Sequence, residues 1–152
     1  MIVARPDAAS NDFAQAGYLS AKVGKSDLCD IFGQGRVRFP KDPDLYVYQG
    51  WAMLNLHRNT EAVAAFETSE QLLASGENPS SYLLAGQAAA NWTAGRKDNA
   101  VDVYVRLITV GQGKINWADS AAVAKADLTN AEKQPLLEAL TETLRQHPEL
   151  AP

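Results

Sequence analysis

The side chains that could do chemistry gather first between Leu54 and Glu67. His57 stands four residues before Glu61, with Arg58 beside it, which is the spacing of two metal ligands on one helical face. Asn59-Thr60 interrupts the pair, however, because these residue types commonly begin a helix. The chain has only two histidines and one cysteine, so further ligands of these types are scarce. We therefore interpret His57 as a polar residue in a turn between two helices and expect no metal site.

The glycine-containing stretches also lack the context that phosphate or cofactor binding needs. Gly24-Lys25-Ser26 matches the end of a phosphate-binding P-loop, but Leu19 stands where that motif requires its first glycine. Gly33-Gln34-Gly35 falls inside an expected helix and is not a dinucleotide fingerprint. No Ser/His/Asp set can be identified with so few histidines. We therefore expect no cofactor, and we predict that the protein is not an enzyme.

Composition narrows the class of protein further. The 152 residues are 46% hydrophobic and 21% charged, as in ordinary globular domains. A net charge of −4 and a pI near 5.1 do not favour a nucleic-acid partner. No apolar run approaches the roughly 18 residues of a membrane span. The lone cysteine, Cys29, and the lack of an apolar leader near the first residues favour the cytoplasm.

Start and stop signals divide the chain into about eight helices and predict no strand. Prolines after Asp42 and Asn78 are typical of the first helical position. Gly76, Gly95 and Gly111 are typical of helix ends. Thr129 and Glu132 have the spacing of a capping box, although Pro135 is an alternative start for the last helix. The expected helices cover 11–23, 26–38, 43–57, 59–75, 79–93, 97–110, 117–126 and a final segment that reaches 147.

The helices repeat in pairs with a period of 34 to 38 residues. The two central pairs agree best, because their apolar and small residues coincide at one constant shift. Positions 38 residues apart match Gly50 with Ala88, His57 with Gly95, Ala62 with Ala100 and Phe66 with Tyr104. One helical pair cannot bury its apolar faces alone, so stacked pairs share a continuous core.

This pattern resembles the tetratricopeptide repeat (TPR). In that family a small residue midway along the first helix lets the second pack closely, and the turn often carries glycine. Gly50, Ala62 and Phe66 fill these roles in one pair, and His57 stands where glycine is common. The resemblance implies an all-α fold, a short right-handed TPR-like α-solenoid of about seven or eight helices. It also implies a single domain, 1–152, with repeat units at about 9–42, 43–78, 79–114 and 117–148.

The resemblance further implies a binding surface, because the first helices of TPR pairs line a concave groove. The residues at the matching positions are Tyr18, Asp44, Val47, Trp51, Leu54, Asn55, Tyr82, Ala85, Ala89 and Trp92. Such a groove suits a partly apolar peptide or helix. The alternative is that these residues fill the core of a tightly wound array.

We therefore expect a non-enzymatic protein–protein interaction module, an adaptor or scaffold with a protein or peptide partner. Two alternatives remain open. One is a small cytosolic chaperone similar to those of type III secretion translocators. The other is a structural fragment of a longer solenoid, whose apolar end packs on further repeats or on a second subunit, as in a homodimer.

Overall fold

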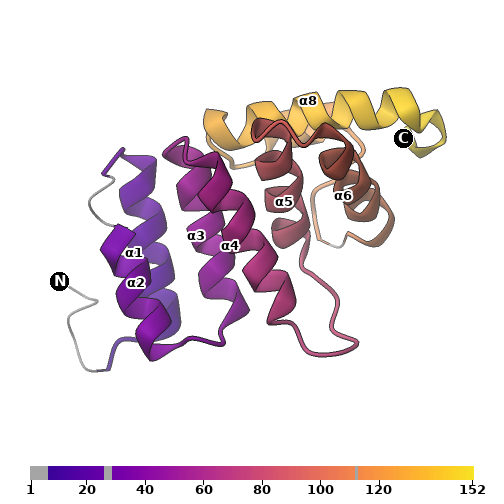
Figure 1. Ribbon diagram of the computed structural model, residues 1–152. Helices are drawn as coiled ribbons and strands as arrows, with labels where there is room; N and C mark the ends of the chain where they lie inside the picture. Colours follow the sequence, from indigo (N-terminus) through magenta and orange to yellow (C-terminus); the bar gives the residue numbers. More distant parts are fainter. Residues whose placement is uncertain (1–6, 26–28, 112) are drawn as a thin grey trace. The chain divides into compact units, whose positions relative to one another are not determined.

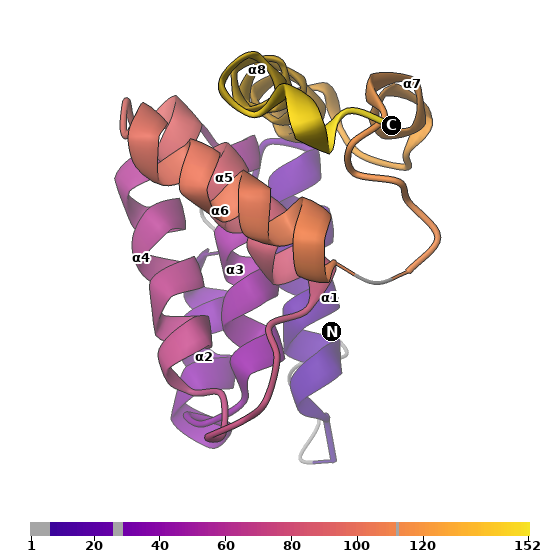
Figure 2. The ribbon, with the colours of Figure 1, turned by 90° about the vertical axis from the view of Figure 1, so that its right-hand side faces the viewer.

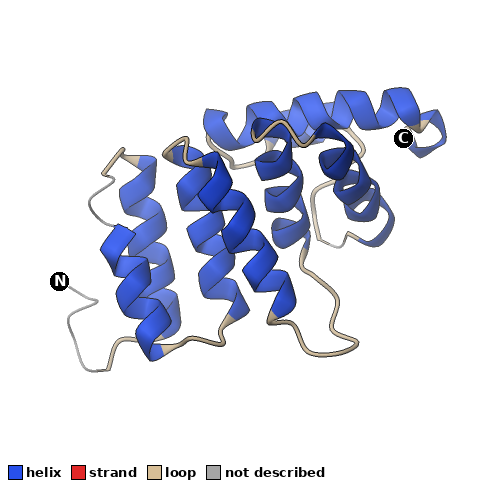
Figure 3. Cartoon of the chain, viewed as in Figure 1, coloured by secondary structure: helices blue, strands red, loops and turns tan. Residues whose placement is uncertain are grey.

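The fold of the described residues is entirely helical (Figures 1 and 3). The computed structural model describes residues 7–25, 29–111 and 113–152, except for the side chain of Cys29. Over these residues the all-α prediction is confirmed. The helices are α1 (Ser10–Lys22), α2 (Cys29–Arg38), α3 (Pro43–Asn55), α4 (Asn59–Gln71), α5 (Ser81–Thr93), α6 (Lys97–Val110), α7 (Ser120–Lys125), α8 (Asn130–Gln146) and a 3-10 helix, η3 (Pro148–Leu150).

The chain divides into two compact units. Unit 1 runs from Met1 to Glu77 and holds α1 to α4, whereas unit 2 runs from Asn78 to Pro152 and holds the remaining helices. No described helix is both long and apolar enough to cross a membrane.

Unit 1 consists of two helical hairpins, α1–α2 and α3–α4, and its first helices α1 and α3 pack on each other. Each hairpin closes around a glycine midway along its first helix. A Cβ atom on Gly50 would lie 2.5 Å from the ring of Phe66 in α4, and one on Gly17 would likewise collide with Phe32 in α2. Both rings are almost completely buried. The expected role of Gly50 is confirmed, and Gly17 has the same role in the first hairpin.

Unit 2 contains one helical hairpin, α5–α6, with α8 crossing it. Figure 2 looks along α8, with α5 and α6 beneath it and α7 beside it. Tyr104 of α6 is completely buried, and its hydroxyl donates to the carbonyl of Trp117 at 2.9 Å. The segment 117–148 was expected to form another stacked pair. Instead, α8 packs more extensively on α5 and α6 than on the short α7.

Three helix-to-helix turns share one backbone geometry. Gly24, His57 and Gly95 have φ angles of 78°, 58° and 81°, in the left-handed region. In each turn this residue donates its N–H three residues back, and the next residue donates five residues back, which defines a Schellman motif. For His57 these bonds reach the carbonyls of Leu54 at 3.1 Å and, from Arg58, of Met53 at 2.9 Å. The interpretation of His57 as the counterpart of Gly95 is confirmed.

Several predicted helix boundaries need correction. α5 begins at Ser81, because the Ser80 hydroxyl accepts from the N–H of Leu83 at 3.1 Å and thereby caps the helix. α4 ends at Gln71, before the expected stop at Gly76. α7 begins at Ser120 rather than at Trp117, since the side chain of Asp119 caps it.

The last helix follows its capping box, not its proline. Thr129 and Glu132 bond reciprocally at the start of α8, and Pro135 is accommodated inside the helix. The expected start of the second helix, at Ser26, lies outside the described residues.

Candidate functional site

The ten predicted groove residues lie on the first helices of the three hairpins, in two separate sets. Unit 1 holds one on α1 and five on α3: Tyr18, Asp44, Val47, Trp51, Leu54 and Asn55. Unit 2 holds four on α5: Tyr82, Ala85, Ala89 and Trp92.

Three members of the unit 1 set belong to the core. Val47, Trp51 and Leu54 are 8%, 6% and 2% exposed. The indole of Trp51 meets the ring of Phe66 edge-on, with centroids 5.7 Å apart. Edge-to-face packing of this kind is a stabilising core contact. These three side chains therefore offer little surface to a partner, and the prediction that they bind one stays a prediction.

The reachable part of unit 1 is built around Tyr18. Its half-buried ring meets that of Tyr48 edge-on at 6.0 Å, and the ammonium group of Lys22 lies 5.4 Å from its centroid. Asn55 is also half-buried, and its amide donates to the carbonyl of Trp51 at 2.9 Å. We call Tyr18, Lys22, Tyr48 and Asn55 the α1–α3 face.

Two residues of the α1–α3 face were missed by sequence reasoning. Tyr48 stands three residues before Trp51, and Lys22 stands four residues after Tyr18, so helical spacing could have indicated both. Asp44, which was predicted, is exposed at the other end of α3. The protein around Asp44 still removes part of the water from its carboxyl group. This desolvation, followed by the negative charges of Asp42 and Glu77, raises the pKa of Asp44 above its ordinary value.

In unit 2 the C-terminal segment of the chain lies on α5. Ala85 and Ala89 are completely buried, and α8 packs on their helix. The indole N–H of Trp92 donates to a carboxylate oxygen of Glu138 in α8 at 2.7 Å, and the Lys97 ammonium lies 4.8 Å from the Trp92 ring.

Tyr82, at the start of α5, also contacts the C-terminal segment. Its ring meets that of Trp117 edge-on, with centroids 6.3 Å apart. At both ends of α5, therefore, an aromatic side chain contacts a later segment of the same chain: Tyr82 contacts Trp117, and Trp92 contacts Glu138.

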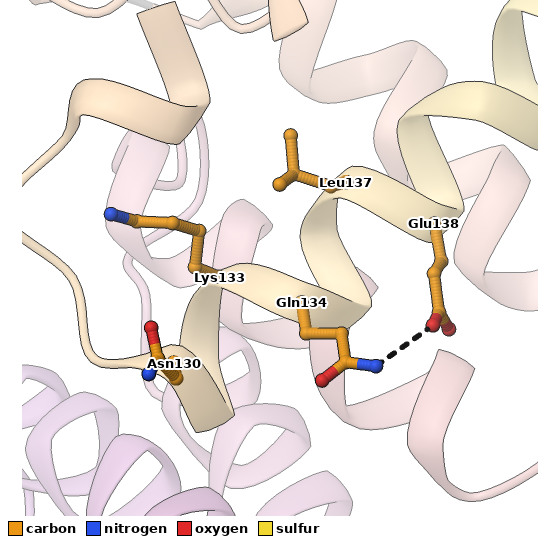
Figure 4. A pocket seen from close by; sticks show the side chains of 5 residues that line it. All are labelled: Asn130, Lys133, Gln134, Leu137 and Glu138. Carbon is orange, nitrogen blue, oxygen red and sulfur yellow. Dashed lines mark hydrogen bonds between the residues drawn. The ribbon is translucent and has the colours of Figure 1, made fainter. Parts of the chain in front are cut away.

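Residues of α8 line a hollow of mixed polarity (Figure 4). Its lining residues are Asn130, Lys133, Gln134, Leu137 and Glu138. The amide of Gln134 donates a hydrogen bond to a carboxylate oxygen of Glu138 at 3.3 Å, so these two polar side chains of the hollow partly satisfy each other. None of these residues was predicted as a site, and only one of them is apolar.

His57 and Glu61 do not form a joint site. The guanidinium group of Arg58 holds both carboxylate oxygens of Glu61, at 2.8 and 2.7 Å. His57 is exposed in its turn. Among the described residues, no group of three or more histidine, cysteine, aspartate or glutamate side chains is placed to hold a metal ion.

Comparisons with protein-family models, with curated proteins and with solved structures found no match to this chain.

Proposed function

We propose that this chain is a protein-interaction module that binds an amphipathic helix of a partner protein on its α1–α3 face. In this role it would serve as an adaptor or scaffold, with no chemical step of its own. The proposal includes the TPR relationship, which the shared turns and the glycine–aromatic packing support.

One observation carries the proposal: in unit 2 the first helix of the hairpin already holds an amphipathic helix. α8 buries Leu136, Ala139 and Leu140 and directs Glu138 to the indole of Trp92. Apolar burial supplies the affinity of such a contact, and the charge-assisted bond fixes its register. The chain thus contains an example of the complex that we propose.

The α1–α3 face offers comparable chemistry on the first helices of unit 1. Tyr18 and Tyr48 present two aromatic rings in contact, and tyrosine is a residue type enriched where partners bind. Lys22 adds a positive charge beside the Tyr18 ring. A partner helix with an apolar stripe and an acidic residue beside it would satisfy both features. In unit 2 Glu138 is such an acidic residue, because it accepts the hydrogen bond of the Trp92 indole.

The chaperone alternative uses the same kind of contact, since it also requires an apolar helix to be held in a repeat groove. Its partner would be one unfolded or secreted protein rather than a set of binding proteins. The single cysteine suits a reducing compartment, and the proposal places the protein in the cytoplasm.

The test is a titration of the ¹⁵N-labelled full chain with a panel of synthetic amphipathic helices. The panel keeps one apolar stripe and varies the flanking residues from acidic to neutral to basic; residues 129–147 of this chain supply the acidic member. We expect the acidic peptide to bind best and to shift the amide signals of α1 and α3. Tyr18→Ala should weaken binding about 5- to 30-fold, as loss of a contact worth ~1–2 kcal/mol does.

Val37→Ala is the matched control, because Val37 is 83% exposed on α2 and lies outside the α1–α3 face. It should leave the affinity unchanged. The proposal fails if no helix of the panel shifts α1 and α3 at millimolar concentration, or if Tyr18→Ala and Val37→Ala bind equally well.

A further inference from the structure

The outward side of α1 carries an exposed apolar strip. Leu19 and Val23 are 58% and 70% exposed, although they lie one turn apart on the same side of the helix end. They follow Gly17 at the same distances at which Ala52 and Leu56 follow Gly50 on α3. Ala52 is completely buried and Leu56 is half-buried. This side of the helix is therefore covered on α3, the first helix of the second hairpin. The equivalent side of α1 is exposed.

The contacts of α3 show that this side is a packing face. Tyr48 meets Tyr18 of the preceding hairpin, and Gln49 accepts a hydrogen bond from Arg36 of α2 at 2.8 Å. Leu45 lies against Gly35, where an added Cβ would approach the leucine to 3.2 Å. These residues correspond on α1 to Asp12, Gln15 and Ala16, which precede Leu19 and Val23 on the same side of that helix.

We propose that a second copy of this chain covers the strip, with the two α1 helices packed antiparallel about a twofold axis. Asp12, Ala16, Leu19 and Val23 follow one another at spacings of four, three and four, which keeps them on one helical face. Antiparallel pairing centred between Ala16 and Leu19 sets each leucine against the small alanine of the partner. The surface is therefore complementary to itself, as a twofold interface requires.

Charge supports the antiparallel direction. Asp12 lies in the first turn of α1, and Lys22 lies in its last turn. In an antiparallel pair each Asp12 comes next to the partner's Lys22, whereas a parallel pair would place like charges together. Opposite charges at both ends thus favour one arrangement over the other.

The small size of the surface indicates a weak dimer. The 13 residues of α1 span about 20 Å, so two such helices bury less than the roughly 1,200 Å² of a standard interface. We therefore expect a reversible dimer with a dissociation constant of roughly 10 to 500 μM, since interfaces below the standard size are weak. Added salt should weaken it, because the ion pairs at the rim are screened.

The test is analytical ultracentrifugation of the full chain from 10 μM to 1 mM, concentrations chosen on the order of the expected dissociation constant. Leu19→Glu should weaken the dimer at least ~10-fold, because it brings two carboxylates together at the centre of the interface. Val37→Glu introduces the same charge at an exposed position on α2 and should leave the dimer intact. Circular dichroism of each variant confirms that the helices are retained.

A charge exchange tests the direction of pairing. Lys22→Glu and Asp12→Lys should each weaken self-association, because each leaves like charges at both ends. Mixed together, the two variants should form a heterodimer, since every contact is again between opposite charges. A chain that stays monomeric to 1 mM, a dimer indifferent to Leu19→Glu, or variants that fail to pair when mixed would overturn the proposal. None of these readouts depends on peptide binding at the α1–α3 face.

Discussion

Tyr104 is the single residue whose burial has the clearest consequence for stability. Its ring is completely buried, and its hydroxyl donates to the Trp117 carbonyl. Burial raises the pKa of Tyr104 above its ordinary value near 10. The folded state therefore holds the phenolic proton more tightly than the unfolded chain does. This contribution to stability is fully present below about pH 10 and is lost as the pH rises further, because only the unfolded chain can then ionise.

We predict that Tyr104→Phe lowers the free energy of unfolding at pH 7 by about 1–3 kcal/mol, because the Trp117 carbonyl loses its buried donor. Above pH 10 the difference should shrink by up to ~1.4 kcal/mol per pH unit, since the variant has no phenol to ionise there. Urea unfolding at pH 7, 10 and 11 measures both effects. Tyr46→Phe is the control, as its hydroxyl makes only an exposed bond to Pro40 at 3.3 Å. A difference that grows with pH would contradict the assignment.

At the scale of the helices, the turns explain why the pairing could be recognised from sequence. A Schellman turn needs one residue in the left-handed region, and glycine at 24 and 95 supplies it without steric cost. His57 was recognisable as their counterpart only because the flanking Gly50, Ala62 and Phe66 fixed the register. Its imidazole had suggested metal chemistry, but its position in the backbone is that of a glycine.

The helix boundaries were predictable where a single signal dominated. Thr129 and Glu132 formed the expected box despite Pro135. Two competing signals misled the prediction at α5, where Pro79 suggested the first helical residue although the Ser80 side chain makes the cap. The placement of α8 was also missed. The six residues of α7 are too few to cover α8. The apolar residues of α8 therefore pack on α5 and α6 instead.

The turns give a prediction of their own. His57→Gly should raise the free energy of unfolding by up to about 1 kcal/mol, because a non-glycine residue in the left-handed region costs about 1–2 kcal/mol and glycine returns part of that in chain entropy. Gly95→Ala should lower the free energy of unfolding by about 1 kcal/mol, because alanine would then occupy the left-handed region. Steric contact is not the cause, since an added Cβ there meets nothing within 4 Å. Urea midpoints of both variants, compared with the wild type, decide this. Shifts in the same direction would show that the two turns are not equivalent.

At the scale of the whole molecule, the sequence predicted hairpins but not which surfaces they would cover. Equivalent positions on α3 and α5 carry Trp51 and Ala89, and both are buried, so helical position alone did not distinguish a binding residue from a core residue. The division into two compact units was likewise hidden, because the repeat pattern continues across residues 77 and 78. What covers each first helix depends on contacts between segments far apart in the chain.

The two compact units lead to the last prediction, which concerns cooperativity. Gly50→Ala places a Cβ atom 2.5 Å from the Phe66 ring, so the α3–α4 hairpin must open at a cost of about 1–3 kcal/mol. Because the main contacts of α3 and α4 are with each other and with α1 and α2, amide protection should fall in α1 to α4 and stay unchanged in α5 to α8. Hydrogen exchange followed by mass spectrometry of the full chain measures this. Gly33→Ala is the matched control, since its Cβ would make only ordinary contacts at 3.7 Å in α2. Equal loss of protection in both halves would mean that the chain unfolds as a single cooperative body.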